Sequence, residues 1–212
     1  MRGALLTAPM LSRIKVFSAL EELLLAEELD AITVRQICEV AGVGRTTFYT
    51  YFRDKYDIVL WYTGLVNETG FGQVGRTLTW KEGNLRTCKG ILAKVDMLNK
   101  AGHSDDRNSI NPYWKRLRIN TMEETLEKYK GVKVDTNLHY QVMACAAAQT
   151  DLGLDYFNDP DRCPLEEFVD ILVQVVPHDL YVLLEEPENP GEKDKQLETM
   201  ELTASLVQQA RF

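Results

Sequence analysis

The sequence has no long hydrophobic run, and none of its apolar stretches approaches the roughly 18 residues that span a membrane. The opening MRGALLTAPM has one basic residue and too short an apolar stretch for a signal peptide. The four cysteines lie far apart and form no CxxC pair, which argues against a zinc site and against a disulfide framework. We therefore expect a cytoplasmic protein with reduced cysteines and no membrane association.

Histidine is scarce too, and familiar catalytic motifs are missing. The three histidines, His103, His139 and His178, are dispersed, and no cysteine or acid stands at ligand spacing beside them. The chain contains no GxSxG, no phosphate-binding loop, no HExxH and no dinucleotide fingerprint. We predict that the protein is not an enzyme and that it holds neither a metal nor another cofactor.

Basic residues are outnumbered, with 24 Lys and Arg against 32 Asp and Glu, and the formal net charge is -8. The acids gather late in the chain: residues 151–212 hold 15 acids and 4 bases, whereas residues 76–133 hold 13 bases and 7 acids. An acidic end repels nucleic acid, so any contact with a polyanion has to be made elsewhere on the surface.

Helical periodicity dominates, and no stretch keeps the alternation of a β-strand beyond a few residues. The sequence therefore predicts an all-α protein. A first helix is expected over residues 10–28. Thr33, with Gln36 as its capping-box partner, starts a second helix that ends at Gly42, a short third helix follows, and Asp54 caps a fourth.

Three glycines at positions 70, 72 and 75 then break the pattern and predict a boundary loop. Further helices are expected near residues 82–101, 112–130, 134–157, 164–176 and 178–185. We divide the chain into an N-terminal unit, residues 1–58, and a C-terminal unit, residues 59–212, in which residues 187–212 are a linker plus a terminal helix. That last helix either docks or frays, and its apolar face is formed by Leu197, Met200, Ala204 and Val207.

The second and third predicted helices have the outline of a helix-turn-helix. Each has an apolar face for the other, and only the residues AGV lie between them, where Gly42 can take a positive φ. The facing residues are Val34, Ile37 and Ala41 on the second helix and Phe48 and Phe52 on the third. If the two phenylalanine rings point inward, the opposite face turns outward, with Arg45, Thr46, Tyr49 and Thr50. A helix presented in this way fits the major groove of DNA.

The stretch ITVRQICEVAGVGRTTFYTYFRDKYDIVLW, residues 32–61, closely resembles the DNA-binding domain of the TetR family of bacterial transcriptional regulators. The third helix of that family usually reads TLYxHF, followed by a Lys three residues later. This chain has TFYTYF over residues 47–52 and then Lys55. The match covers about fifty residues and combines cap, turn, aromatic spacing and Lys at fixed offsets.

Roles for individual residues follow from this resemblance. It implies that Arg45 and Thr46 read bases, and that phosphates are held by Thr47, Tyr49, Tyr51 and Lys55. Tyr51 stands where the family usually has His, and its phenol can still donate a hydrogen bond to phosphate. Thr33, at the start of the second helix, and Thr50 complete the predicted DNA-binding residues.

The resemblance also implies the architecture of the whole protein: an N-terminal three-helix DNA-binding head and a C-terminal helical bundle for ligand binding and dimerisation. In the family, a small molecule bound in the C-terminal domain moves the two heads of a homodimer apart. The segments DKYDIVLW and LDYFNDP look like the branch that includes the activators of dihydroxyacetone-kinase operons. The expected partners are therefore a double-stranded DNA operator, a second copy of the chain and a small-molecule effector.

An alternative is a TetR-like co-regulator that acts by protein contacts without binding an operator. The near balance of 7 bases and 8 acids over residues 1–60 favours it. The basic run WKRLR, with Lys115, Arg116 and Arg118, reads as a solvated helix face or as a second anionic contact.

Two further sets of residues are nominated, and the alternative reading of each member is ordinary core. For the effector pocket the candidates are aromatic and polar side chains of the second unit: Trp61, Tyr62, Trp80, Tyr113, Trp114, His139, Tyr140 and Met143. For the dimer interface they form the broad apolar face of one predicted helix: Leu165, Phe168, Val169, Leu172, Val173 and Val176.

Overall fold

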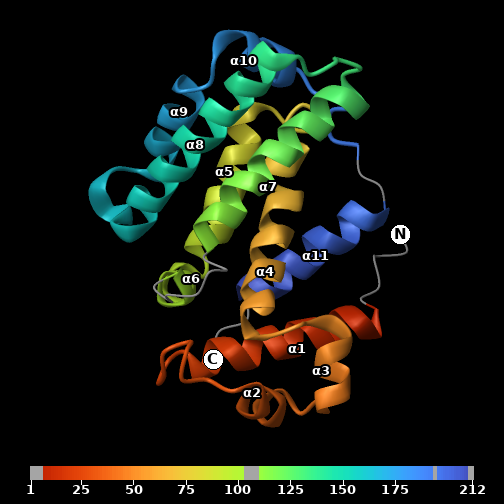
Figure 1. The fold of residues 1–212 in the computed structure, drawn as a ribbon, viewed down its shortest axis with the longest axis vertical. Helices are drawn as coiled ribbons and strands as arrows, with labels where there is room; N and C mark the ends of the chain where they lie inside the picture. The colour runs from red at the N-terminus through yellow and green to blue at the C-terminus, as the bar shows by residue number, and fades with distance from the viewer. Residues whose placement is uncertain (1–6, 103–109, 193–194, 210–212) are drawn as a thin grey trace.

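The computed structural model describes residues 7–102, 110–192 and 195–209, and over these ranges the chain is all-α and contains no β-strand, as the sequence predicts (Figure 1). The helices are α1 (Ala8–Leu23), α2 (Val34–Ala41), α3 (Arg45–Tyr51), α4 (Lys55–Thr69), α5 (Trp80–Leu92), α6 (Val95–Gly102), α7 (Ile110–Glu124), α8 (Thr136–Asn158), α9 (Leu165–Gln174), α10 (His178–Glu185) and α11 (Lys195–Gln209). Three short turns join them: η1 (Phe71–Gln73), the π-helical η2 (Thr125–Tyr129) and η3 (Pro160–Arg162).

Helices α1 to α3, which we call the head, lie at the lower end of the molecule in Figure 1. Helices α5 to α10, which we call the body, lie above them, and α4 runs from the head up into the body. The boundary predicted after residue 58 falls inside α4 (Lys55–Thr69), so the division of the chain into two units stays a prediction.

Local capping signals determine where the helices of the head begin and end. Thr33 and Gln36 form a complete capping box at the start of α2. Gly42 ends that helix in the left-handed region, with φ 62° and ψ 35°, where glycine has no steric penalty. Asp54 caps α4 by accepting a hydrogen bond from the backbone N–H of Asp57 at 2.8 Å. All three assignments made from the sequence are confirmed.

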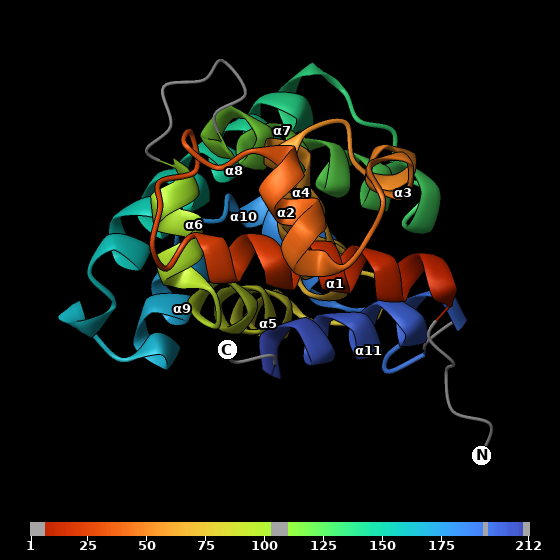
Figure 2. The same cartoon turned by 90° about the horizontal axis from the view of Figure 1, so that it is seen from below.

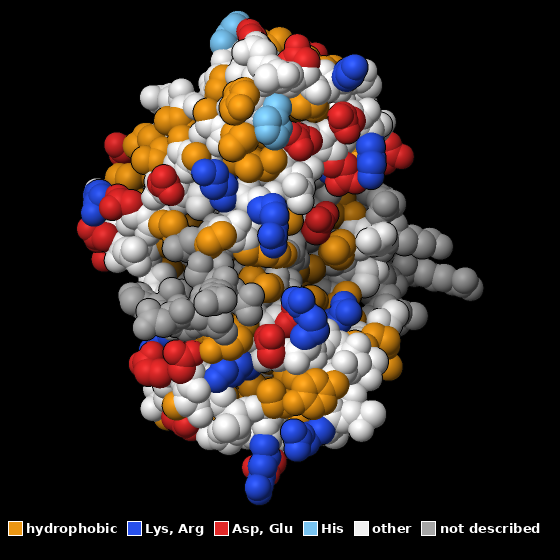
Figure 3. All heavy atoms as spheres, in the orientation of Figure 1, with side chains coloured by type: hydrophobic (Ala, Val, Ile, Leu, Met, Phe, Trp, Pro, Cys, Tyr) orange, Lys and Arg blue, Asp and Glu red, His pale blue; other side chains and the backbone are white. Residues whose placement is uncertain are grey.

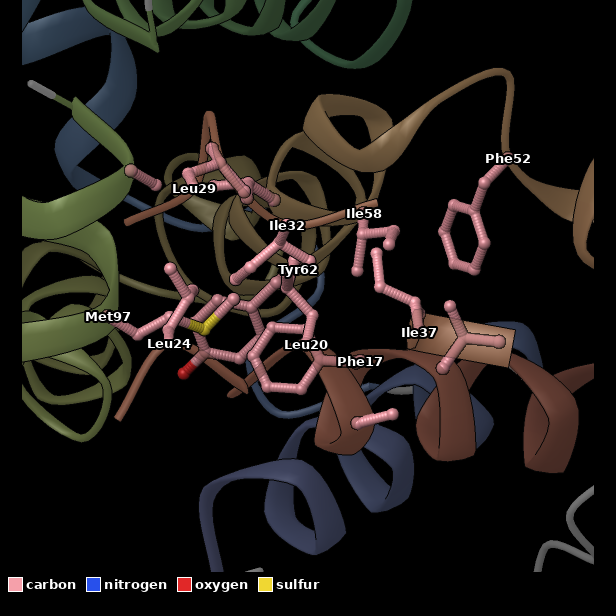
Figure 4. Packing of buried hydrophobic residues seen from close by; sticks show 14 of the residues in the cluster. Phe17, Leu20, Leu24, Leu29, Ile32, Ile37, Phe52, Ile58, Tyr62 and Met97 are labelled. Carbon is pink, nitrogen blue, oxygen red and sulfur yellow. The ribbon is translucent and has the colours of Figure 1, made fainter. Parts of the chain in front are cut away.

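The core of the head is largely aromatic. Phe48 and Phe52 are 0% and 2% exposed, and their ring centroids lie 5.9 Å apart. Phe52 meets Trp61 of α4 edge-on at 6.0 Å, and Trp61 meets Phe17 of α1 at the same distance. Figure 4 shows Phe17 of α1, Ile37 of α2 and Ile58 of α4 in this core, together with Phe52, which follows α3. The two phenylalanines therefore point inward, as the helix-turn-helix pattern predicts.

Helix α1 is shorter than predicted and ends at Leu23 rather than near residue 28. At that end the carbonyl of Leu24 accepts a hydrogen bond from Nζ of Lys100 in α6, at 2.6 Å. A carbonyl at the end of a helix lacks an intrahelical partner, and here a distant lysine supplies one. The end of α1 thus makes a tertiary contact that the local sequence does not reveal.

The single helix predicted over residues 82–101 is in fact two, α5 and α6, because the chain turns at Ala93 and Lys94. The turn directs Lys94 toward α1, where its ammonium pairs with the carboxylate of Glu21 at 2.6 Å. The Lys94 side chain is 3% exposed and that of Glu21 is 20% exposed, so this is a partly buried ion pair that joins the body to the head.

The glycine-rich segment predicted as a boundary loop lies inside the body instead. Gly70 directly precedes the buried turn η1 and Gly72 lies within it, and a Cβ added at Gly70 would lie only 2.3 Å from Oγ1 of Thr87 in α5. The same hydroxyl accepts a hydrogen bond from the backbone N–H of Phe71 at 2.7 Å. Glycine is needed here for close approach to α5 rather than for a flexible linker.

Helix α11 docks rather than frays. Leu197, Ala204 and Val207 are buried, and the helix lies against α4 and α1. Figure 2 shows α11 alongside α1 when the molecule is viewed from below. An ion pair of 2.6 Å between Arg86 of α5 and Glu201 also holds α11 to the body. The last helix therefore touches both head and body.

Candidate functional site

The outward face of α3 carries the residues that the sequence places there. Arg45, Thr46, Tyr49 and Thr50 are all exposed, and Tyr49 is 51% exposed. The Tyr49 ring rests edge-on against the buried ring of Phe48 at 5.3 Å, which fixes its position without covering it. The arrangement presents a guanidinium, two hydroxyls and a phenol on one side of a short helix. Figure 3 shows basic side chains at this lower tip of the molecule.

The remaining DNA-binding candidates lie around this face and differ in how far they are buried or bonded within the head. Thr47 and Tyr51 are partly buried, and the guanidinium of Arg13 lies 5.5 Å from the Tyr51 ring centroid. Thr33 is exposed, but its hydroxyl is used in the capping box with Gln36 at 2.6 Å. Tyr51 is therefore held by a cation–π contact within the head, on the side next to α1.

Lys55 has a structural role that sequence reasoning did not find. Its Nζ donates to the backbone carbonyls of Asp30 at 2.8 Å and Ile32 at 2.9 Å, in the segment that leads into α2. An ammonium group has three N–H donors, so one remains for a phosphate. Lys55 thus ties the first turn of α4 to the start of the helix-turn-helix, and contact with DNA stays a prediction.

Two other arginines of the head are paired with acids. Arg35 and Glu39 lie 2.8 Å apart on α2, and Arg53 and Asp57 lie 2.7 Å apart at the start of α4. The hydrogen bond from Arg53 lowers the pKa of the Asp57 carboxyl. Exposed pairs of this kind contribute little stability, but they neutralise part of the positive charge of the head.

A cavity of about 220 Å³ lies in the body among α5 to α9. Its lining is largely apolar, with Ile91, Leu98, Trp114, Leu154, Phe157 and Leu172. Arg118, Gln149, Thr150 and Asn99 contribute polar groups. Apolar walls with a few convergent polar groups are typical of a small-molecule site.

Arg118 is the charged residue among the described residues of this lining. The sequence suggested a solvated face for it, but the side chain is buried, with 5% of the residue exposed. Its Nη1 donates to Oε1 of Gln149 at 2.8 Å, and its guanidinium lies 4.2 Å from the ring centroid of Phe71. Burial lowers the pKa of the guanidinium. Its neighbours in the basic run behave as expected of a helix surface, since Arg116 is exposed and Lys115 partly so.

Of the eight effector candidates, the cavity contains one, Trp114. Trp61 and Tyr62 pack with the core of the head, and Trp80 is fully buried against Phe71. The structure places the others as follows: Tyr113 approaches Gly64 of α4, Met143 is partly buried on α8, and His139 and Tyr140 lie beside a separate shallow depression.

Sequence reasoning did not nominate Arg118 or Thr150 for the effector pocket. The four-residue spacing between Trp114 and Arg118 puts both on one face of α7, and this spacing was the signal available for Arg118. For Thr150 there was no comparable signal, because small polar residues occur throughout the helical segments.

The candidate dimer face on α9 is largely used inside the chain. Phe168, Val169 and Leu172 are each less than 5% exposed, and Phe168 stacks on Tyr156 at 3.9 Å. Leu165, Val173 and Val176 are partly buried. Large apolar side chains that do face solvent on α8, α9 and α10 are Tyr140, Ile171 and Val182.

No described helix has the length and apolar composition needed to cross a membrane. Likewise, the described residues contain no group of three or more His, Cys, Asp and Glu side chains placed to hold a metal ion.

Comparisons with known proteins relate this geometry to a family. Residues 16–60 match the sequence profile described as bacterial regulatory proteins, tetR family. A search of curated proteins gives no significant match. Among solved structures, the chain is similar to a protein described as dihydroxyacetone kinase operon activator DhaS, with 15% identity, a TM-score of 0.59, and coverage of 82% of this chain and 98% of that chain.

A second similar structure is the TetR family repressor AlkX from Dietzia sp. strain DQ12-45-1b, described as implicated in biodegradation of n-alkanes. The identity is again 15%, the TM-score is 0.50, and the match covers 80% of this chain and 98% of that chain. At this identity both structures show a common fold and no more.

Proposed function

As a member of the TetR family of bacterial regulatory proteins through its head, this chain is, we propose, a DNA-binding transcriptional regulator. It acts as a homodimer, and a small molecule in the body cavity sets its affinity for an operator. The observation that carries the proposal is the anchoring of α3: Phe48 and Phe52 are buried, so Arg45, Thr46, Tyr49 and Thr50 face solvent together.

The chemistry of this face suits double-stranded DNA. Arg45 stands at the first position of α3, where a recognition helix reaches base edges, and a guanidinium can donate two hydrogen bonds to guanine. Threonine and tyrosine hydroxyls donate to phosphate oxygens and set the register of the helix on the duplex. We assign base reading to Arg45 and Thr46, and phosphate contact to Tyr49 and to the remaining proton of Lys55.

Two copies are needed because one short helix contacts few base pairs, and paired half-sites lie about one helical turn apart. Support for a dimer comes from the outward side of α8, where Tyr140 is 63% exposed and Ala144 is exposed, with Ile171 of α9 and Val182 of α10 also facing solvent. Figure 3 shows hydrophobic side chains gathered over the upper part of the molecule, where Figure 1 places α8 and α9. Small and apolar residues allow two such helices to approach a second pair.

The dimer is tested by the mass of the protein in solution, measured by light scattering. Ala144→Glu places a charge on the outward side of α8 and is expected to give the mass of one chain instead of two. Lys15→Glu, an exposed change on α1, is the control and should leave the mass unchanged. A wild-type protein with the mass of one chain at micromolar concentration contradicts this part of the proposal.

Coupling between the cavity and the head is assigned to α6. Leu98 and Asn99 line the cavity, while the next residue, Lys100, donates to the carbonyl of Leu24 at the end of α1. Lys94, just before α6, forms a partly buried ion pair with Glu21 of α1 and joins the same two parts. A ligand that displaces α6 therefore changes the tilt of α1 and with it the spacing of the two recognition helices.

Operator binding is tested by fluorescence anisotropy with a duplex from the region upstream of the gene and an unrelated duplex of equal length. The wild-type protein is expected to bind its own upstream duplex about a thousandfold or more tightly than the unrelated one at moderate salt. Arg45→Ala should reduce this ratio, and Arg35→Ala, which removes an exposed arginine already paired with Glu39, is the matched control. Equal affinity of the wild-type dimer for both duplexes contradicts sequence-specific regulation.

A second candidate is a co-regulator that acts through protein contacts without an operator. It is favoured by the balance of 7 bases and 8 acids over residues 1–60 and by the use of two Lys55 protons inside the head. The same anisotropy experiment separates the two functions. A folded dimer that fails to bind either duplex at low salt supports the co-regulator.

A further inference from the structure

The guanidinium of Arg118 is a buried charge with little to compensate it. Of its five N–H donors, the described residues occupy one, through Oε1 of Gln149. Gln149 is held in turn, because its Nε2 donates to the carbonyl of Leu172 at 2.8 Å. The ring of Phe71 offers a cation–π contact at 4.2 Å, which stabilises the charge only in part.

Negative charge is missing from the surroundings of Arg118 in the described part of the chain. Among the described residues, the cavity lining contains no Asp or Glu, and no carboxylate lies within ion-pair distance of the guanidinium. The titratable groups that act on it are the thiols of Cys88 and Cys145, and burial raises the pKa of each to about 12. Both thiols are therefore neutral near pH 7 and supply no counter-charge.

A second polar group in the cavity also lacks a partner. Thr150 is 8% exposed, lines the same cavity, and its hydroxyl is buried with no hydrogen-bond partner among the described residues. It directly follows Gln149 on α8. A buried hydroxyl without a partner costs free energy, and a buried charge without one costs more. The unpartnered hydroxyl of Thr150 and the uncompensated charge of Arg118 thus line one cavity.

We propose that the body cavity binds a small monoanionic carboxylate with an apolar alkyl or aryl group, and that Arg118 and Thr150 bind its carboxylate. This inference rests on the proposed function, in which the cavity holds the effector, and it specifies the chemical class of that effector. The guanidinium fork matches the two oxygens of a carboxylate, and the hydroxyl of Thr150 donates a further hydrogen bond.

The rest of the lining decides between kinds of anion. Ile91, Leu154, Phe157 and Leu172 form apolar walls that have nothing to offer a sugar or a nucleotide. The amides of Asn99 and Gln149 already donate to the backbone carbonyls of Phe157 and Leu172. A phosphate dianion needs more donors than Arg118 and Thr150 supply, whereas a carboxylate monoanion is neutralised by a single guanidinium. The volume of about 220 Å³ lies below the roughly 300–1,000 Å³ of pockets for drug-sized ligands. A compact carboxylate fits these limits.

The test measures the binding of matched probe pairs to the full-length protein by isothermal titration calorimetry without DNA. Benzoate is compared with benzamide and hexanoate with hexanamide, because each pair keeps one shape and differs in charge. In at least one pair the carboxylate is expected to bind tenfold or more tightly than the amide. If the amides bind as tightly as the carboxylates, or if none of the four binds at millimolar concentration, the proposal is overturned.

Variants locate the binding. Arg118→Met keeps the length and apolar stem of the side chain and should abolish the preference for the carboxylate, while Arg116→Met, an exposed change on the same helix, should retain it. Thr150→Val is expected to weaken carboxylate binding about tenfold, and Thr136→Val, exposed at the start of α8, is its control. A carboxylate preference that persists in Arg118→Met places the anion elsewhere and overturns the assignment.

Failure of the carboxylate proposal can be distinguished from failure of the proposed function. Selective carboxylate binding together with unchanged operator affinity leaves the anion site in place and removes its role as effector site. Specific operator binding without carboxylate selectivity leaves the proposed function in place, as a DNA-binding regulator, and shows that the proposed chemical class of the effector is wrong.

Discussion

The orientation of α3 depends most on Phe48, and Phe48→Ala is the substitution that tests it. The side chain is fully buried and contacts the rings of Phe52, at 5.9 Å, and Tyr49, at 5.3 Å. Truncating a buried Phe to Ala loses transfer free energy and leaves a cavity, with a typical cost of about 3–5 kcal/mol. With a urea slope of about 2 kcal/mol per molar, the unfolding midpoint should fall by roughly 1.5–2.5 M.

Tyr49→Ala is the matched control, since it removes an adjacent aromatic ring from the same helix. Because Tyr49 is half exposed, its loss should cost only the edge contact with Phe48, about 0.5–1.5 kcal/mol. Urea unfolding followed by circular dichroism measures both variants, and anisotropy measures their binding to DNA. Phe48→Ala should lose stability and DNA binding together, whereas Tyr49→Ala should lose DNA binding while staying folded.

The comparison has a clear contrary result. If Phe48→Ala shifts the midpoint no further than Tyr49→Ala, the Phe48 ring does not anchor α3. The outward face built on that anchor would then have no fixed position, and the proposed contact with a major groove would fail with it.

Three further predictions concern the head. Gly42→Ala forces an L side chain into φ 62° and should cost about 1–2 kcal/mol in the unfolding free energy, measured by urea denaturation; an unchanged midpoint would refute the role of the turn. Lys55→Ala should weaken binding to all duplexes alike and reduce the slope of log affinity against log salt concentration by about one ion. Arg45→Ala should instead relax the base preference by about 1–3 kcal/mol at one position of the operator. Identical effects of the two substitutions would contradict the assigned roles. Arg53 lowers the pKa of Asp57, so this carboxylate stabilises the fold at neutral pH, and the contribution disappears as the pH falls below about 4. The difference in unfolding free energy between the wild type and Asp57→Asn should therefore narrow on acidification. A difference that widens would contradict the lowered pKa of Asp57.

The head could be predicted from the sequence because its signals are local. Thr33 and Gln36 stand three residues apart, so the capping box that starts α2 involves only residues of one turn. Gly42 and Asp54 likewise act on their immediate neighbours. Phe48 and Phe52 are one helical turn apart, so their common face follows from the period of the helix.

The body was less predictable because its decisive contacts join residues far apart in sequence. Lys94 turns the chain toward Glu21, 73 positions earlier, and periodicity alone does not distinguish such a turn from a continuous helix. Arg118 carries a charge that composition assigns to the surface, and only the packing of Phe71 and Gln149 around it reveals the cavity. Sequence therefore located the candidate DNA-binding face, while the candidate effector site needed the three-dimensional arrangement.

The docking of α11 has a consequence for how the protein is made. Val207 is fully buried in the same cluster of side chains as Phe17 and Leu20, near the opposite end of the sequence. During translation, the helices of the head leave the ribosome with this part of their core open, and it closes only after residue 207 has been synthesised. Newly made chains therefore acquire a rigid head late, and a ribosome that stalls before that point leaves apolar surface on α1 and α4 exposed to chaperones and proteases.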